Sequence, residues 1–250
     1  MSSRAIVLAE AVRTAIGAYN GTLKGVPATE LGAVVVRETL RRSGLDGAEI
    51  GAVVMGNVIQ AGNRMNPARQ AALGGKVPVS VPAMTINRVC GSGAQAIVTA
   101  ANEVVCGDHD VAVAGGMENM DRAPYLLDGG RWGYRMGPGQ VLDSMLTDGL
   151  LDAFSGEHSG WHTEDLVAKL GITRAEQDAF AVRSQQGFVA AQKEGRFLDQ
   201  IVPVEIKSRK GVDRSKPMRR PDPTRRQKVS LGSSLRSART APSRPAMRRA

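Results

Sequence analysis

A cysteine stands where a strand-like segment gives way to a helix-like one, within the stretch Asn87–Ala96. The thiolate is the reactive form of cysteine, and the unpaired N–H groups and positive dipole end of a helix N-terminus favour that anion. Gly91 and Gly93 carry no side chain, so backbone and substrate can approach closely. The pattern predicts that Cys90 is a nucleophile on a tight strand-to-helix turn. It also fits a small, buried cysteine in front of a packed helix.

The other cysteine and the histidines give weaker signals. Two cysteines are too few for a disulfide framework, and neither has the partner spacing of a zinc site. Cys106 is interpreted as a small buried apolar residue, as free cysteines usually are. His109 lies in a polar turn, where we expect it to be solvated. His158 and His162 lie further along the chain.

Strand-like and helix-like segments alternate along residues 1–118. The predicted strands are Ala5–Val12, Ala52–Ile59, Ala83–Val89 and a fully buried Val111–Met117. The predicted helices are Thr29–Ser43, Asn66–Leu73 with Pro67 in its first turn, and Gly91–Val105. Thr29 is expected to cap the first helix and Gly44 to end it. The alternation predicts βαβ units, and hence an α/β fold whose mostly parallel sheet is covered on both sides.

Over Ala94–Val105 nearly every side of the predicted helix is apolar or small, so we expect this helix to be buried all round.

The sequence pattern changes after about residue 118, where strand-like segments no longer alternate with helix-like ones. Thr173-Arg174-Ala175-Glu176 forms a capping box before a helix that ends near Gly195. Residues 211–250 contain no aromatic residue and no periodic pattern, a composition that alone predicts disorder. We therefore expect an N-terminal half at 1–119, a loop domain at 120–207 and a basic low-order tail at 208–250.

Several motifs, in order along the chain, resemble those of the thiolase family. Asn87–Ala96 resembles the family's active-site segment around the acylated cysteine. Further matches spread over roughly residues 4–207, at Arg13–Gly17, Gly56–Gly62, Asn66–Gln70, Gly115–Met120, Asp148–Leu150, Asp152–Phe154, Gln177-Asp178 and Ser184–Gln186. The resemblance implies an α/β thiolase-like βαβαβ half plus part of a helical loop domain. The second half of that fold has no counterpart in this sequence.

The resemblance implies the activity of an acyl-CoA:acetyl-CoA C-acyltransferase. Such an enzyme forms an acyl thioester on the cysteine that matches Cys90 and then condenses it with acetyl-CoA, or cleaves a 3-ketoacyl-CoA such as acetoacetyl-CoA in reverse. The implied partners are acetyl-CoA and acyl-CoA substrates and further copies of the chain, as a dimer or tetramer. CoA thioesters enter as substrates, and neither a cofactor nor a metal is implied.

Parts of the family's active site lack a counterpart here. A second catalytic cysteine, a Gly-His-Pro histidine and an Asn-Glu motif that helps form the oxyanion hole belong to the family's C-terminal half. His158 matches a loop-domain position that the resemblance places against the pantetheine arm, and a structural, hydrogen-bonded histidine fits equally well. Ser159 and His162 replace a Met and a Thr of the family, so the acyl-chain length is not predicted. We expect little or no turnover from this chain alone.

The basic balance of the chain resides in its last forty residues. The formal net charge is +9, and residues 211–250 hold 12 Lys and Arg against two Asp, which leaves −1 for the rest. Without aromatic residues to stack on bases, this segment is not expected to bind nucleic acid. We favour a shift of the reading frame near residues 208–217. Synonymous codons for Met218–Arg249 can be chosen so that the same bases, read one base out of frame, encode a thiolase-like segment. Resequencing the gene tests this hypothesis.

Three functions remain open from the sequence. They are a thiolase impaired by its missing motifs, a condensing enzyme of the ketoacyl-synthase type, and a non-catalytic thiolase remnant that binds CoA or intact subunits. The ketoacyl-synthase type shares the cysteine but lacks the loop-domain motifs. No stretch reaches the roughly 18 apolar residues of a membrane helix and no secretion signal is recognised, so we expect a cytoplasmic protein without membrane contact. Loss of a second half would expose the helix that begins at Gly91 and lower the solubility.

Overall fold

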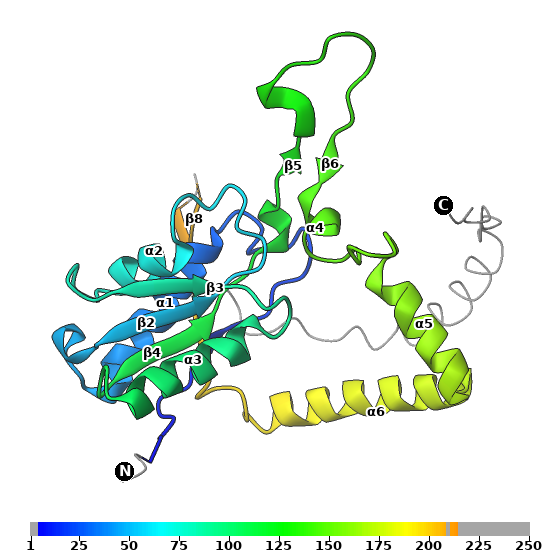
Figure 1. Cartoon of the computed structure of the whole chain (residues 1–250). Helices are drawn as coiled ribbons and strands as arrows, with labels where there is room; N and C mark the ends of the chain where they lie inside the picture. Colours follow the sequence, from blue (N-terminus) through cyan, green and yellow to red (C-terminus); the bar gives the residue numbers. More distant parts are fainter. Residues whose placement is uncertain (1–4, 209–210, 215–250) are drawn as a thin grey trace. The chain divides into compact units, whose positions relative to one another are not determined.

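The computed structural model describes residues 5–208 and 211–214 (Figure 1). They form two compact units, one of residues 5–163, 198–208 and 211–214 and the other of residues 164–197. The frame-shift hypothesis and the nucleic-acid alternative concern residues that lie almost entirely outside the described ones.

Three parallel strands form the sheet of the larger unit. They are β2 (Ala52–Gly56), β3 (Ala83–Ile86) and β4 (Ala112–Gly116), in the order β3-β2-β4. Val54 of the central strand β2 pairs with Met84 on one side and Ala114 on the other. Every residue of β2 is buried, as expected for an apolar strand with neighbours on both edges and helices on both faces. The predicted α/β fold with a parallel sheet is confirmed.

Helices cover both faces of this sheet. They are α1 (Ala28–Ser43) and α2 (Pro67–Gly74) on one face and α3 (Ser92–Cys106) on the other (Figure 1). Successive side chains of a strand point to opposite faces. Val53 and Met55 therefore join the core beneath α1 and α2, while Val54 packs against Ala96 and Ala100 of α3.

The first helix ends as predicted but begins differently. Gly44 adopts the left-handed conformation (φ 71°) and its N–H donates to the Leu40 carbonyl, which closes α1. The prediction that Thr29 caps this helix is wrong, because α1 follows directly on Pro27 and Thr29 lies buried inside its first turn. Proline fixes φ at the start of the helix, and no side chain caps the first turn.

Two other helix starts predicted from local signals are confirmed. Pro67 opens α2, and the side chain of Asn66 accepts the N–H of Arg69 at 3.2 Å. The capping box of α6 (Arg174–Lys193) is complete, because the Thr173 hydroxyl accepts the Glu176 N–H at 3.3 Å while Glu176 accepts the Thr173 N–H at 2.7 Å. These signals act within four residues, which is why the sequence alone predicts them.

The predicted strand Ala5–Val12 is wrong. This segment has no regular structure, and Val7 and Leu8 are 81% and 72% exposed. The first strand of the described chain is the two-residue β1 (Arg13–Thr14), which comes directly after this segment and pairs in parallel with β7 (Ile201–Val202). A strand needs a hydrogen-bonded neighbour, and none of the described segments pairs with residues 5–12. An apolar run alone therefore does not decide the outcome.

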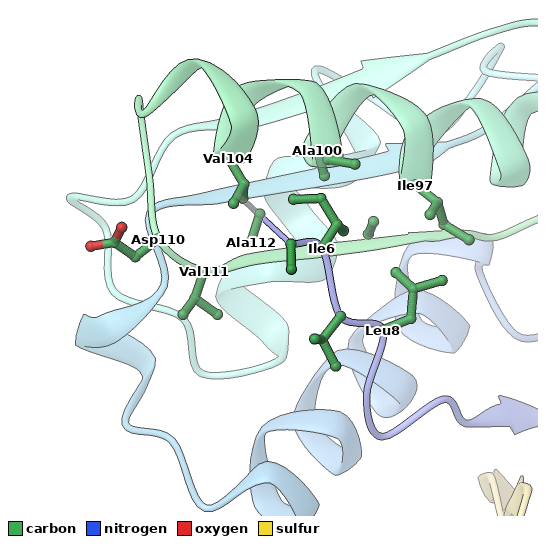
Figure 2. Close-up of a pocket in the computed structure, with 12 residues that line it drawn as sticks. Ile6, Leu8, Ile97, Ala100, Val104, Asp110, Val111 and Ala112 are labelled. Carbon is green, nitrogen blue, oxygen red and sulfur yellow. The ribbon is translucent and has the colours of Figure 1, made fainter. Parts of the chain in front are cut away.

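The outer side of β4 is only partly covered. An apolar hollow lies between the N-terminal segment, α3 and β4, lined by Ile6, Leu8, Ile97, Ala100, Val104 and Val111 among others (Figure 2). Of the residues of β4 only Val113 is buried, so the prediction of a fully buried fourth strand is wrong. Among the described strands β4 pairs with β2 alone, which leaves one edge of the strand open.

Helix α3 is buried on one face and not all round, contrary to the prediction. Val98 and Val105 are 50% and 53% exposed, which agrees with the separate expectation that this helix exposes apolar side chains. Cys106 at its end is also exposed, so its interpretation as a buried residue is wrong. His109 is half-buried against Gly51 and only partly solvated, because the turn after α3 folds back on the start of β2.

The remaining elements are short or lie apart from the sheet. They are η1 (Gly47–Glu49), η2 (Met120–Arg122), η3 (Asp128–Arg131), β5 (Tyr125–Leu126), β6 (Leu142–Asp143), α4 (Ser144–Thr147), α5 (Ser159–Leu170), β8 (Glu205–Ser208) and β9 (Gly211–Arg214). β9 pairs antiparallel with β8, so the disorder predicted for 211–250 is wrong for 211–214. None of the helices in the described part of the chain has the length and apolarity to cross a bilayer.

Candidate active site

Cys90 lies on the turn that the sequence predicted. β3 ends at Ile86 and not at the predicted Val89, and α3 begins at Ser92, so five residues make the whole connection. Val89 adopts φ 47°, in the left-handed region that β-branched residues rarely occupy. The backbone closes tightly there, with the N–H of Gly91 donating to the Arg88 carbonyl at 3.0 Å. Strain of this kind persists only where the surroundings enforce it, and it gathers at functional sites.

The hydroxyl of Ser92 holds this turn from inside. It accepts the N–H of Arg88 at 2.8 Å and donates to the carbonyl of Val89 at 2.6 Å. Ser92 is 4% exposed, so both bonds are shielded from water. Ser92 was not among the residues predicted from the sequence, although a serine that bonds to nearby backbone groups is a local signal.

Asn87 connects the turn to the loop after β2. Its side-chain oxygen accepts the N–H of Val89 at 2.9 Å, and its side-chain nitrogen donates to the carbonyl of Val58 at 3.3 Å. On the other side of the turn Arg88 donates to Gln95 of α3 at 2.5 Å. Cys90 is therefore flanked by residues that are anchored in two directions.

Glycines let the start of α3 approach the ends of the strands. A Cβ on Gly56, at the end of β2, would lie 2.7 Å from the backbone carbon of Ser92. A Cβ on Gly116, at the end of β4, would lie 3.3 Å from the Cα of Gly93. Side chains there would push the helix away, so the two glycines place the N-terminus of α3 at the carboxyl edge of the sheet. This is the edge where parallel α/β sheets commonly carry their ligands.

Cys90 is exposed and lies two residues before an open helix start. Within the described part of the chain no acceptor takes the N–H groups of Gly93 and Ala94. A Cβ on Gly93 would meet no atom within 4 Å, so the space beside the helix start is free. Unpaired N–H groups at a helix N-terminus are suited to stabilise negative charge.

A half-buried carboxyl group lies behind this edge. Glu118, just beyond β4, accepts the N–H of Val58 at 2.7 Å and the side-chain N–H of Asn57 at 3.0 Å. Burial raises the pKa of Glu118, and the bonds from Val58, Ile59 and Asn57 oppose that rise. Glu118 lies in the family-like motif Gly115–Met120, but its role was not predicted from the sequence.

The two loop histidines make local contacts. The Nδ1 atom of His158 accepts the N–H of Gly160 at 2.9 Å at the start of α5, and no hydrogen bond joins His158 to Cys90 within the described residues. His162 Nε2 lies 3.0 Å from the Ser155 hydroxyl and 3.9 Å from Asp152. Because serine and aspartate meet the same ring nitrogen, this trio is not a relay of the serine-protease kind. The pKa of Asp152 is lowered, chiefly by the backbone N–H of Ser155.

The fold and the turn together define an α/β protein that presents an exposed cysteine at the carboxyl edge of a parallel sheet. Residues 6–244 match the family described as thiolase, N-terminal domain. The chain belongs to the thiolase family.

Curated relatives agree with this membership. The chain is 51% identical over 206 residues to an acetyl-CoA acetyltransferase of Pseudomonas aeruginosa and 49% identical to one of Cupriavidus necator. It is also 49% identical to a probable acetyl-CoA acyltransferase of Staphylococcus aureus. Each alignment covers 82% of this chain and 52% of the relative. The chain therefore spans about half the length of the curated relatives that it matches.

Proposed function

We propose that this chain is the nucleophile-bearing part of an acyl-CoA:acetyl-CoA C-acyltransferase and that Cys90 forms the acyl thioester. The observation that carries the proposal is the exposure of Cys90 on a strained turn in front of the open N-terminus of α3. Activities of relatives that share half their length with the chain support the type of reaction.

The proposed chemistry has two covalent steps. The Cys90 thiolate attacks the thioester carbonyl of an acyl-CoA, the new carbon–sulfur bond forms, and the CoA thiolate leaves and takes up a proton. A base, which the family resemblance places in the C-terminal half, then takes an α-proton from acetyl-CoA. The resulting carbanion attacks the acylated cysteine, which forms the carbon–carbon bond of a 3-ketoacyl-CoA and releases the Cys90 thiolate. The reverse sequence is thiolysis. The open N–H groups of Gly93 and Ala94 are our candidates for stabilising negative charge near this cysteine.

The proposed substrates are acetyl-CoA, acyl-CoA and 3-ketoacyl-CoA thioesters such as acetoacetyl-CoA. His158 remains our proposal for a contact to the pantetheine arm, since its Nδ1 bond to Gly160 leaves the other ring nitrogen for a ligand. We also propose association with further copies of the chain, as a dimer or tetramer. The exposed apolar side chains of α3, such as Val98 and Val105, support that proposal.

The second candidate is a non-catalytic thiolase remnant that binds CoA or intact subunits. It is favoured by one observation, namely that no histidine, cysteine or carboxylate hydrogen-bonds to Cys90 in the described part of the chain. Proton transfer to and from the reacting groups would then lack a partner side chain.

Mass spectrometry of the chain after incubation with acetyl-CoA separates the candidates. We expect one acetyl group on the peptide that contains Cys90, none in a Cys90→Ser variant, and unchanged labelling in a Cys106→Ser variant. Thiolysis of acetoacetyl-CoA is measured in parallel and should be very slow. Equal acetylation of Cys106, which is also exposed, would show that exposure alone accounts for the reaction and would refute the assigned role.

A further inference from the structure

The carboxyl group of Glu118 is connected to the turn of Cys90 although the two are far apart in sequence. We infer that Glu118 is a positioning residue for Cys90 and acts through Val58 and Asn87. The inference rests on the proposed function, because it concerns the presentation of the same nucleophile.

The first step of the connection lies at the carboxyl ends of β2 and β4. Glu118 Oε2 accepts the backbone N–H of Val58 at 2.7 Å, and Oε1 accepts the side-chain N–H of Asn57 at 3.0 Å. Asn57, which is 1% exposed, also donates to the carbonyl of Met117 at 3.2 Å. The loop after β2 is thereby tied to the end of β4 by three bonds.

The second step runs from this loop to the turn. The carbonyl of Val58 accepts the side-chain N–H of Asn87 at 3.3 Å, and the oxygen of the same amide accepts the N–H of Val89 at 2.9 Å. Val89 carries the positive φ and directly precedes Cys90. A shift of Val58 therefore changes the amide that holds the strained residue, and with it the direction of the thiol.

A carboxylate suits this place better than an amide would. Both oxygens of Glu118 accept, and the groups that face them, the backbone N–H groups of Val58 and Ile59 and the side-chain N–H of Asn57, are donors. A glutamine would turn its NH₂ group toward one of these donors, whichever way it is oriented. One donor would then lose its acceptor in a half-buried place, which is costly.

The test is alkylation of the chain with iodoacetamide, followed by peptide mass spectrometry across neutral to alkaline pH. Cys106 lies at the opposite end of α3 and serves as internal reference. We expect Glu118→Gln to lower the ratio of Cys90 to Cys106 labelling about tenfold, as the cost of one unsatisfied donor allows. Glu118→Asp should recover part of the ratio, and Glu176→Gln on α6 should leave it unchanged.

A double-mutant cycle tests the route through Asn87, whose exposed side chain can be removed without emptying the core. Asn87→Ala should lower the ratio by a similar factor, and the combination with Glu118→Gln should lower it no further. An unchanged ratio in Glu118→Gln, or losses that multiply in the double variant, would overturn the inference. Because alkylation needs no CoA thioester, failure of Cys90 acetylation in the parent chain would refute the proposed function separately.

Discussion

The contact between the end of β2 and the start of α3 yields a prediction of opposite sign for two neighbouring glycines. In Gly56→Ala the new methyl group would lie 2.7 Å from the backbone carbon of Ser92 and 2.9 Å from the N atom of Gly93. Backbone atoms cannot rotate away as a side chain can, so the strand or the helix start must move. We expect a loss of about 1–3 kcal/mol in the free energy of unfolding, the usual cost of overpacking a core.

The matched control is Gly93→Ala, one residue into the same helix start. Its methyl group would meet no atom within 4 Å, and alanine in a helix is favoured over glycine. We expect this variant to gain about 0.5–1 kcal/mol. The two substitutions add the same methyl group on the two sides of one contact, in a strand where it meets backbone atoms and in a helix where it meets none within 4 Å.

Urea unfolding followed by circular dichroism measures both effects, with the midpoint as readout when the slope is unchanged. Alkylation of Cys90 provides a second readout, because displacement of the start of α3 in Gly56→Ala should change its rate relative to Cys106. A Gly56→Ala variant as stable as the parent chain would refute the close approach of α3 to β2. The same conclusion would follow from equal losses in both variants.

Three further predictions concern other parts of the chain. The hydrogen bond from Arg41, and next that from Arg42, lowers the pKa of Glu38 to about 2. This carboxylate therefore stabilises the fold fully above its usual pKa of 4.5, and the contribution is lost as the pH falls through about 2. Glu38→Gln should cost at most about 1 kcal/mol at neutral pH and nothing in acid unfolding below about pH 2. Thr173→Ala should weaken the first turn of α6 by about 1 kcal/mol, seen as faster amide exchange there and not in α1. Val98→Lys should raise the soluble fraction of the expressed chain, because Val98 is exposed on α3. An unchanged fraction would contradict the expectation that the exposed apolar face of α3 lowers the solubility.

Local signals in the sequence predict much of this fold. The helix that ends at Gly44, the helix that opens at Pro67 and the capping box at Thr173 all depend on neighbours a few residues away. The central strand β2 is also predicted, because a continuous apolar run is typical of a strand buried on both sides, although β2 ends at Gly56 and not at the predicted Ile59. The strand-to-helix turn of Cys90 follows in the same way from the residues on either side of it.

The failures share one physical cause. Ala5–Val12 has the composition of a strand but no described partner, and β4 has the composition of a buried strand but an open edge. Cys106 has the type of a buried residue but lies at the exposed end of α3. Pairing and burial depend on which distant segments lie alongside, and residue type does not specify them.

The candidate site divides along the same line. Residue types and their order in the sequence determined the cysteine, the glycines around it and the resemblance to thiolases. Only the tertiary structure decided that Glu118 supports this cysteine, since the bonds from Glu118 to Val58 and from Val58 to Asn87 join residues 60 and 29 positions apart. Such bonds form where the carboxyl ends of parallel strands meet, and the sheet must fold before those ends become neighbours.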